Sequence, residues 1–136
     1  MTDPIEPVKF ARNLILELAA GTLLEDVPVD AYRLEAEGEP PRIVLKEGGD
    51  VHERGVGMLN PARIRATCYG TDPRQASRMY RALVAILHRA GPLVRDGVGL
   101  FKAFDETGPQ PLTDPDTRWD AVFGVFDLHL ADRPVA

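Results

Sequence analysis

The chain has 136 residues, 44 % of them apolar, and a formal net charge of −5. This length and apolar content suit a single folded domain with its own core. The acidic balance argues against a general nucleic-acid-binding protein, which is normally basic over the whole domain, and no apolar run approaches the roughly 18 residues of a membrane span.

The first predicted element is an N-terminal helix. Asp3 can cap this helix, Pro4 suits its first position and Gly21 suits its end. Between them, apolar residues recur at helical spacing, namely Val8, Ala11, Leu14, Ile15, Leu18 and Ala19. A stripe of this kind predicts a helix that covers one face of a sheet.

Residues 22–61 predict a strand followed by a long loop. Residues 31–36 alternate between apolar and polar, and they are either a short strand or an extended segment. Residues 42–47 predict a firmer strand, because β-branched residues favour this conformation. Residues 47–61 include four glycines and predict a mobile loop, in which His52 and Arg54 are candidate protein contacts.

Residues 62–70 alternate most clearly and predict a second strand. One side carries Ile64, Ala66 and Cys68, and the other carries Arg63, Arg65, Thr67 and Tyr69. The strand therefore has one apolar face, suited to a core, and one basic and aromatic face.

A second helix is predicted from Pro73 to the stop at Gly91-Pro92. Asp72 can cap it, and Gln75 completes a capping box. Its buried stripe is predicted to be Ala76, Met79, Tyr80, Leu83, Leu87 and Ala90. The opposite face carries Arg74, Arg78, Arg81, His88 and Arg89.

Two further strands are predicted near the C-terminus. Residues 99–106 form the first, residues 107–117 form a proline-rich turn, and residues 118–131 form a long final strand. Phe123 and Val125 lie in a part of the final strand that is apolar on both faces. This pattern is typical of a strand buried on two sides, inside the sheet or at a subunit contact.

Together these elements predict one α+β domain over residues 1–136, with a mobile loop at 47–61 and a frayed tail at 132–136. The hairpin-like links favour a mainly antiparallel four-stranded sheet with both helices packed on one face. The other face, which would carry Arg63 and Arg65, is left for another contact.

The sequence contains no motif for catalysis or for binding a metal or cofactor. The three histidines lack metal-ligand spacing, and the single cysteine excludes an intrachain disulfide. Cys68 alternates with apolar residues and is expected to be a buried small hydrophobe. We therefore expect no enzyme activity, no metal and no cofactor.

Charge is unevenly distributed along the chain. Residues 1–60 carry 12 acidic and 6 basic side chains, residues 61–95 carry 1 and 7, and residues 96–136 carry 8 and 3. Either these segments neutralise one another within the fold, or the molecule presents oppositely charged surfaces to partners. The arginine face of the second helix is correspondingly either solvated or in contact with acidic protein, including a neighbouring copy.

Trp119 begins the final strand and is either a core anchor or an interface anchor. The candidate protein-interface residues are therefore His52, Arg54, Arg63, Arg65, Arg74, Arg78, Arg81, Trp119, Phe123 and Val125.

Two stretches carry a family resemblance. They are ARIRATCYGTDPRQASRMYRALVAIL and LFKAFDETGPQPLTDPDTRWDAVFGVFDLHL. The short motifs between their predicted elements are Tyr69-Gly70 before a helix, Gly108-Pro109, and the DPDT turn at 114–117 before a strand that begins at Trp119. This arrangement, over roughly residues 40–131 and more loosely the first helix, resembles the tail terminators of long-tailed (siphovirus-like) bacteriophages.

The resemblance implies a homo-oligomeric structural protein of the virion tail or neck, assembled in the host cytoplasm. It implies a hexameric ring that caps the tail tube, stops its polymerisation and docks onto the head-neck connector. DNA would pass through the ring only as cargo, and no membrane would be involved. Two alternatives remain open: another neck ring protein of the head-completion or stopper type, and a small-molecule-binding α+β domain.

Overall fold

The computed structural model describes residues 7–32, 39–48, 59–95, 98–115 and 117–132. No helix within these ranges is long and apolar enough to cross a membrane. Most of the predicted loop at 47–61, including His52 and Arg54, lies outside the described residues, as does nearly all of the predicted tail.

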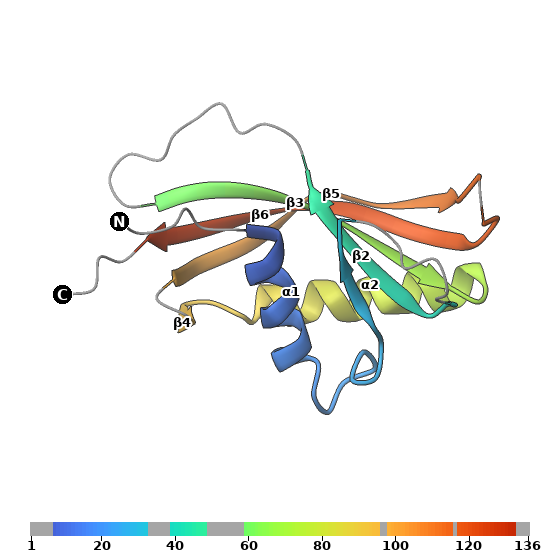
Figure 1. Ribbon diagram of the computed structural model, residues 1–136, viewed down its shortest axis with the longest axis horizontal. Helices are drawn as coiled ribbons and strands as arrows, with labels where there is room; N and C mark the ends of the chain where they lie inside the picture. The colour runs from blue at the N-terminus through green and yellow to red at the C-terminus, as the bar shows by residue number, and fades with distance from the viewer. Residues whose placement is uncertain (1–6, 33–38, 49–58, 96–97, 116, 133–136) are drawn as a thin grey trace.

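The strands of the described part form one six-stranded sheet against two helices (Figure 1). The elements are α1 (Pro7–Leu18), β1 (Val29–Ala31), β2 (Arg42–Glu47), β3 (Leu59–Gly70), α2 (Pro73–His88), β4 (Leu93–Arg95), β5 (Val98–Thr113) and β6 (Asp120–Asp132). The order across the sheet is β1-β2-β3-β6-β5-β4, with β1 parallel to β2 and the other neighbours antiparallel. The α+β class is confirmed, but four strands was too few.

The two extra strands lie at the edges of the sheet. Both β1 and β4 have only three residues, too few to show a clear alternation. β1 also comes earlier than predicted, since it ends at Ala31, where the predicted segment 31–36 begins. Tyr32 follows with a φ of 72°, and residues 33–36 lie outside the described ranges.

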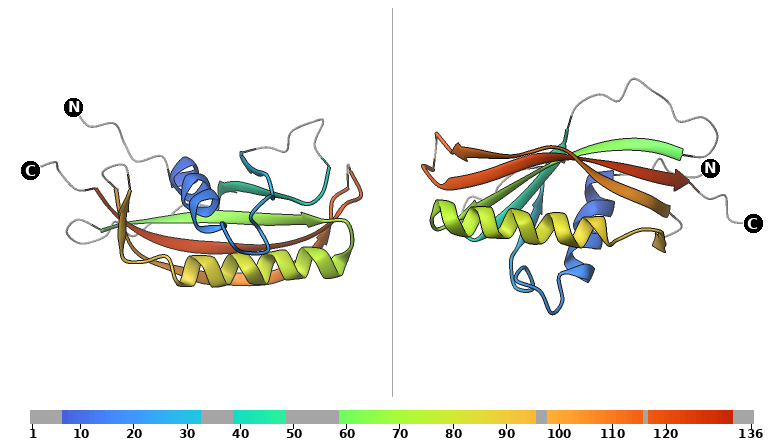
Figure 2. Two further views of the ribbon diagram at one scale, coloured as in Figure 1. Left: turned by 90° about the horizontal axis from the view of Figure 1, so that it is seen from below. Right: turned by 180° about the vertical axis from the view of Figure 1, so that it is seen from behind.

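Both helices cover the same face of the sheet, as predicted (Figure 2). α1 packs on β1, β2 and β3, whereas α2 packs on β3, β5 and β6. A single apolar cluster lies between the two layers, and its largest fully buried members include Leu14, Ile15, Ile43, Leu45, Met79, Tyr80, Leu83, Phe126, Leu128 and Leu130.

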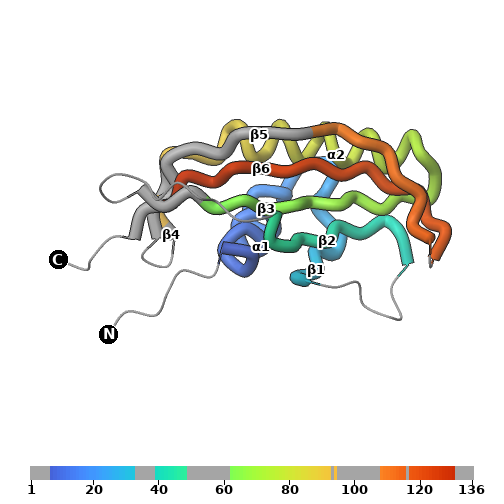
Figure 3. The backbone as a smooth tube through the Cα atoms, turned by 90° about the horizontal axis from the view of Figure 1, so that it is seen from above, coloured from blue at the N-terminus to red at the C-terminus, as the bar shows by residue number. Residues whose placement is uncertain are grey.

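The predicted proline-rich turn at 107–117 is wrong for its first part, because β5 continues through Thr113 (Figure 3). Pro109 and Pro111 fit within this strand because here β5 pairs with β6 alone; β4 pairs only with residues 98–100. A proline is tolerated at a free edge, because no neighbouring strand there needs a hydrogen bond from its backbone N–H. The hairpin actually turns between Asp114 and Trp119, whose backbones hydrogen-bond at 2.9 Å.

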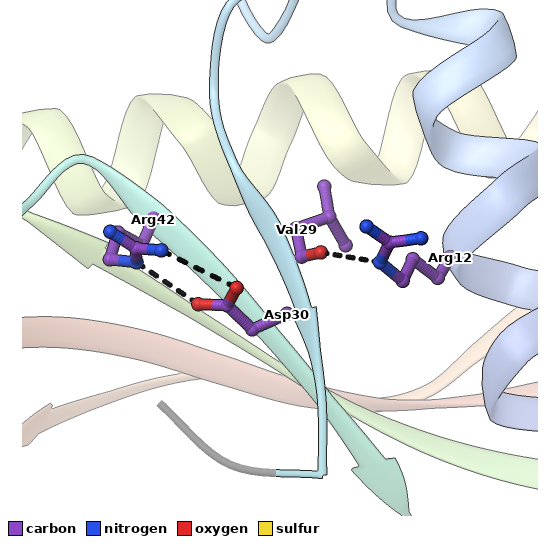
Figure 4. Close-up of polar contacts among 4 residues, drawn as sticks. All are labelled: Arg12, Val29, Asp30 and Arg42. Carbon is purple, nitrogen blue, oxygen red and sulfur yellow. Dashed lines mark hydrogen bonds and ion pairs between the residues drawn. The ribbon is translucent and has the colours of Figure 1, made fainter. Parts of the chain in front are cut away.

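Polar contacts fasten the edge strand β1 to α1 and to its neighbour β2 (Figure 4). Arg12 of α1 donates from Nε to the Val29 carbonyl at 2.8 Å. The Arg42 guanidinium of β2 donates to both carboxylate oxygens of Asp30, at 3.0 and 3.4 Å. The Arg42 and Asp30 side chains are only 12 % and 14 % exposed, so this pair is shielded from solvent.

We expect Asp30→Ala to lower the free energy of unfolding by about 2–3 kcal/mol, because it leaves the guanidinium of Arg42 largely buried without its partner. Urea denaturation at pH 7 measures this loss. Asp26→Ala is the control, since Asp26 is exposed and should change stability by less than about 0.5 kcal/mol. Equal losses of unfolding free energy in the two variants would contradict a stabilising role for the pair of Asp30 and Arg42.

The passage from β3 into α2 is very tight. A Cβ atom at Gly70 would lie 2.5 Å from the backbone nitrogen of Ala76, so only glycine fits there. The Asp72 carboxylate accepts from the Gln75 N–H at 2.7 Å, and the Gln75 side chain accepts from the Thr71 N–H at 2.6 Å. The predicted cap is thereby confirmed, and it starts the helix immediately after the strand.

Gly70→Ala should cost about 2 kcal/mol of stability, since the added methyl group meets rigid backbone. Gly21→Ala is the matched methyl addition: it meets no atom within 4 Å, and its φ of +77° costs about 1 kcal/mol. Thermal melts of both variants test the difference. If Gly21→Ala loses more stability than Gly70→Ala, the backbone around Gly70 can move aside for a methyl group at little cost, and the prediction is wrong.

Candidate functional site

The face of the sheet turned away from the helices is the first candidate site, and we name it the outer face. It consists of the side chains of Arg42, Val44, Lys46, Arg63, Arg65, Thr67, Tyr69, Ala121, Phe123, Val125, Asp127 and His129, which alternate with the core residues of β2, β3 and β6. No helix or strand that the structure describes lies over it (Figures 2 and 3). The sequence correctly placed Arg63, Arg65 and Tyr69 on this face.

An apolar row crosses the centre of the outer face. Val44 lies opposite Thr67, and Thr67 lies opposite Phe123 in the register of the sheet. Val44 and Thr67 are 3 % and 8 % exposed, and Phe123 is half-buried. The Arg65 guanidinium carbon lies 4.3 Å from the centre of the Phe123 ring, a cation–π distance. Arginine and aromatic surface are therefore presented together.

A cross-strand ion pair borders this row. Arg63 and Asp127 face each other in the register, and Nε of Arg63 lies 3.3 Å from a carboxylate oxygen of Asp127. Their side chains are 34 % and 25 % exposed, so the pair adds less than about 1 kcal/mol to stability. Its main effect is to hold the Arg63 guanidinium against the sheet.

An aromatic pair occupies the end of the outer face near the β5–β6 turn. The rings of Tyr69 and Trp119 meet edge to face, with their centres 5.8 Å apart. The Tyr69 hydroxyl donates to the Asp114 carboxylate at 3.3 Å. Burial raises the pKa of Tyr69, and the charge and hydrogen bond of Asp114 add to that effect against an opposing contribution from Arg65. Tyr69 is therefore a neutral hydrogen-bond donor near pH 7.

At the end of β2, Gly48 lies close to both β3 and β6 on the outer face. Gly48 donates its N–H to the Arg63 carbonyl at 2.8 Å. A Cβ atom at Gly48 would lie 3.1 Å from Cγ1 of Val125. This close approach accounts for glycine at position 48 and explains part of the burial of Val125.

The predicted interface residues fall on two separate surfaces. Arg63, Arg65, Phe123 and Val125 lie on the outer face, and Trp119 contacts Tyr69 there. The arginines of α2 lie in the helix layer on the other side of the sheet, and all three predicted members, Arg74, Arg78 and Arg81, are exposed. One continuous basic surface is thus ruled out for these residues.

Sequence reasoning missed the acidic partners in the site. Asp114 was interpreted only as a turn residue and Asp127 was not singled out, because neither has a local sequence signal. Their partners Tyr69 and Arg63 lie 45 and 64 residues away along the chain. The strand register brings them together, and that register could be predicted only from a correct pairing of β3 with β6.

The one cysteine is not activated for chemistry. Cys68 is fully buried, and burial raises the pKa of its thiol far above the ordinary range, so it is not an activated nucleophile. Among the described residues, no group of three or more His, Cys, Asp and Glu side chains could hold a metal ion.

The chain matches no protein-family model, and no curated protein is significantly similar to it.

Tyr69→Phe should reduce stability at pH 7 by about 1 kcal/mol, because it removes the hydrogen bond to Asp114. Because the pKa of Tyr69 is raised in the folded state, its contribution is complete below about pH 10, the ordinary tyrosine value, and is lost as the pH rises above it. Urea denaturation from pH 7 to 11 should show that the free energy of unfolding falls less with rising pH in the variant than in the parent protein. Parallel profiles for variant and parent would contradict this role.

Proposed function

We propose that the protein is a structural ring subunit of the phage tail-terminator type. In this proposal a hexameric ring caps the tail tube, halts its polymerisation and joins the tail to the head-neck connector, with DNA only passing through. The resemblance of residues 40–131 motivates the proposal. The observation that carries it is the outer face, a sheet surface that combines aromatic and arginine side chains and has no described helix over it.

The composition of the outer face suits a protein contact. Arginine and aromatic residues are enriched at interfaces, and the residues that dominate binding energy lie in partly buried clusters of this kind. Arg65 stacked on Phe123, together with the Tyr69–Trp119 pair, supplies two such clusters. Both are held in place by the sheet, so a partner would meet a rigid surface and lose little side-chain freedom on binding.

The outer face can build a ring if it binds a different patch on the next subunit. A head-to-tail contact of that type closes into a ring when its rotation divides the circle evenly. The half-buried side chains Phe123 and Val125 of the outer face would then pack against that other patch of the next subunit. The apolar character of both sides of the last strand is then explained by a core on one side and a subunit contact on the other.

The test is sedimentation velocity of the purified chain over a concentration series, followed by negative-stain imaging. We expect a discrete ring, and we expect Phe123→Ser to raise the concentration for half-assembly by about tenfold or more. Leu16→Ser, at a leucine that is 41 % exposed on α1, tests whether the second patch includes α1, whereas Phe123→Ser must weaken assembly in either case. Thermal melts establish that both variants fold.

The ring should also shorten tail tubes when it is added to polymerising tail-tube protein from the same phage. A chain that stays monomeric at all concentrations and never binds tail tubes would contradict the proposal. A ring that leaves tube length unchanged would favour the other neck ring proteins.

A further inference from the structure

A second surface lies in the helix layer, between α2 and the segment 18–27, and we name it the helix groove. The chain that leaves α1 runs beside α2 toward its N-terminal end (Figure 2). Two pockets follow this line, with volumes of about 310 and 320 Å³. The apolar lining of the first pocket includes Leu23, Val27 and Met79. The apolar lining of the second includes Leu18, Ala82 and Ile86.

The two pockets repeat at a helical interval. Met79 in the first pocket is seven residues before Ile86 in the second, and Arg78 in the first is seven residues before Ala85 in the second. Seven residues of helix rise about 10.5 Å, or nearly two turns. Side chains at positions i and i+7 of a partner helix have the same separation, which is the anchor spacing of helix-in-groove recognition.

The groove is basic on its α2 side. Arg74, Arg78, Arg81 and Arg89 are all exposed, and none is ion-paired with another described residue. Asp72 also lines the first pocket, but its carboxylate accepts the capping hydrogen bond from Gln75. The exposed acids of segment 18–27, Glu25 and Asp26, line neither pocket.

A solvated helix face does not account for the apolar part of this surface. Leu23 is 62 % exposed, the highest value among the exposed large apolar residues of the described part, and it lies in the pocket shared with Arg74 and Arg78. Nucleic acid fits poorly as well, since no aromatic side chain lines either pocket to stack on a base. Apolar pockets beside arginines that have no ion-pair partner in the described part of the chain suit a ligand that is both apolar and acidic.

We propose that the helix groove binds an acidic amphipathic helix of a partner protein. Two apolar side chains of that helix, seven residues apart, enter the two pockets. Carboxylates beside them pair with Arg74, Arg78, Arg81 and Arg89, whose planar guanidinium groups can bind a carboxylate through two hydrogen bonds. This contact lies in the helix layer and leaves the outer face open, so it does not depend on ring formation.

The test is fluorescence anisotropy with the full chain and a labelled 20-residue helical peptide. The peptide carries leucines at positions i and i+7 and glutamates along the flanking positions. We expect saturable binding that weakens with added salt. A second peptide of the same composition, with leucines at i and i+5, should bind at least about tenfold more weakly because its leucines point to different sides of the helix.

Variants locate the site. Arg74→Glu with Arg78→Glu, and separately Leu23→Ser, should each raise the dissociation constant by about tenfold or more, since all three residues line the first pocket. Lys9→Glu is a charge-reversal control, since Lys9 is exposed on the first half of α1 and lines neither pocket. All of these positions are exposed, so the variants should fold, and thermal melts verify it.

Three results would overturn the proposal. They are a peptide that does not bind, equal affinity for the two leucine spacings, and displacement of the peptide from the groove by a DNA duplex at a lower concentration than by unlabelled peptide.

Discussion

The antiparallel pairing of β3 with β6 determines what both faces of the molecule present. Its register runs without a break from Leu59 opposite Ala131 to Gly70 opposite Asp120. Side chains alternate along a strand, so this single register sends one set to the helices and the other set outward. A slip by one residue would exchange Phe126 for Val125 in the core and would separate Arg63 from Asp127. The core and the outer face therefore depend on the same constraint.

The elements with strong local signals were predicted well. β2 and the start of α2 match the prediction, because alternation and the Asp72 cap are encoded within a few residues. The extension of β5 through Pro109 and Pro111 was missed because proline signals a turn unless the strand is known to be at an edge. Within the site, the sequence identified the arginines but not their partners, because Arg63 and Asp127 meet only through tertiary pairing.

The arginines of the middle of the chain have two different environments, which the segment charges alone could not separate. Arg63 and Arg65 lie flat on the sheet, against Asp127 and Phe123 respectively. Those of α2 project from the helix layer without a partner among the described residues. The two proposals use different surfaces: the ring contact uses the outer face, and the partner helix uses the helix groove. A subunit built this way could assemble with its own copies while it binds a different protein.

Trp119 is the single tryptophan of the chain and lies against Tyr69, so its fluorescence reports directly on the outer face. We expect the Trp119 emission to shift to shorter wavelength, and acrylamide to quench it less, as the protein concentration passes through the range in which sedimentation detects assembly. In Phe123→Ser, both changes should move to higher concentration together with assembly. Assembly without any change in Trp119 emission or quenching would contradict the claim that the outer face is the subunit contact.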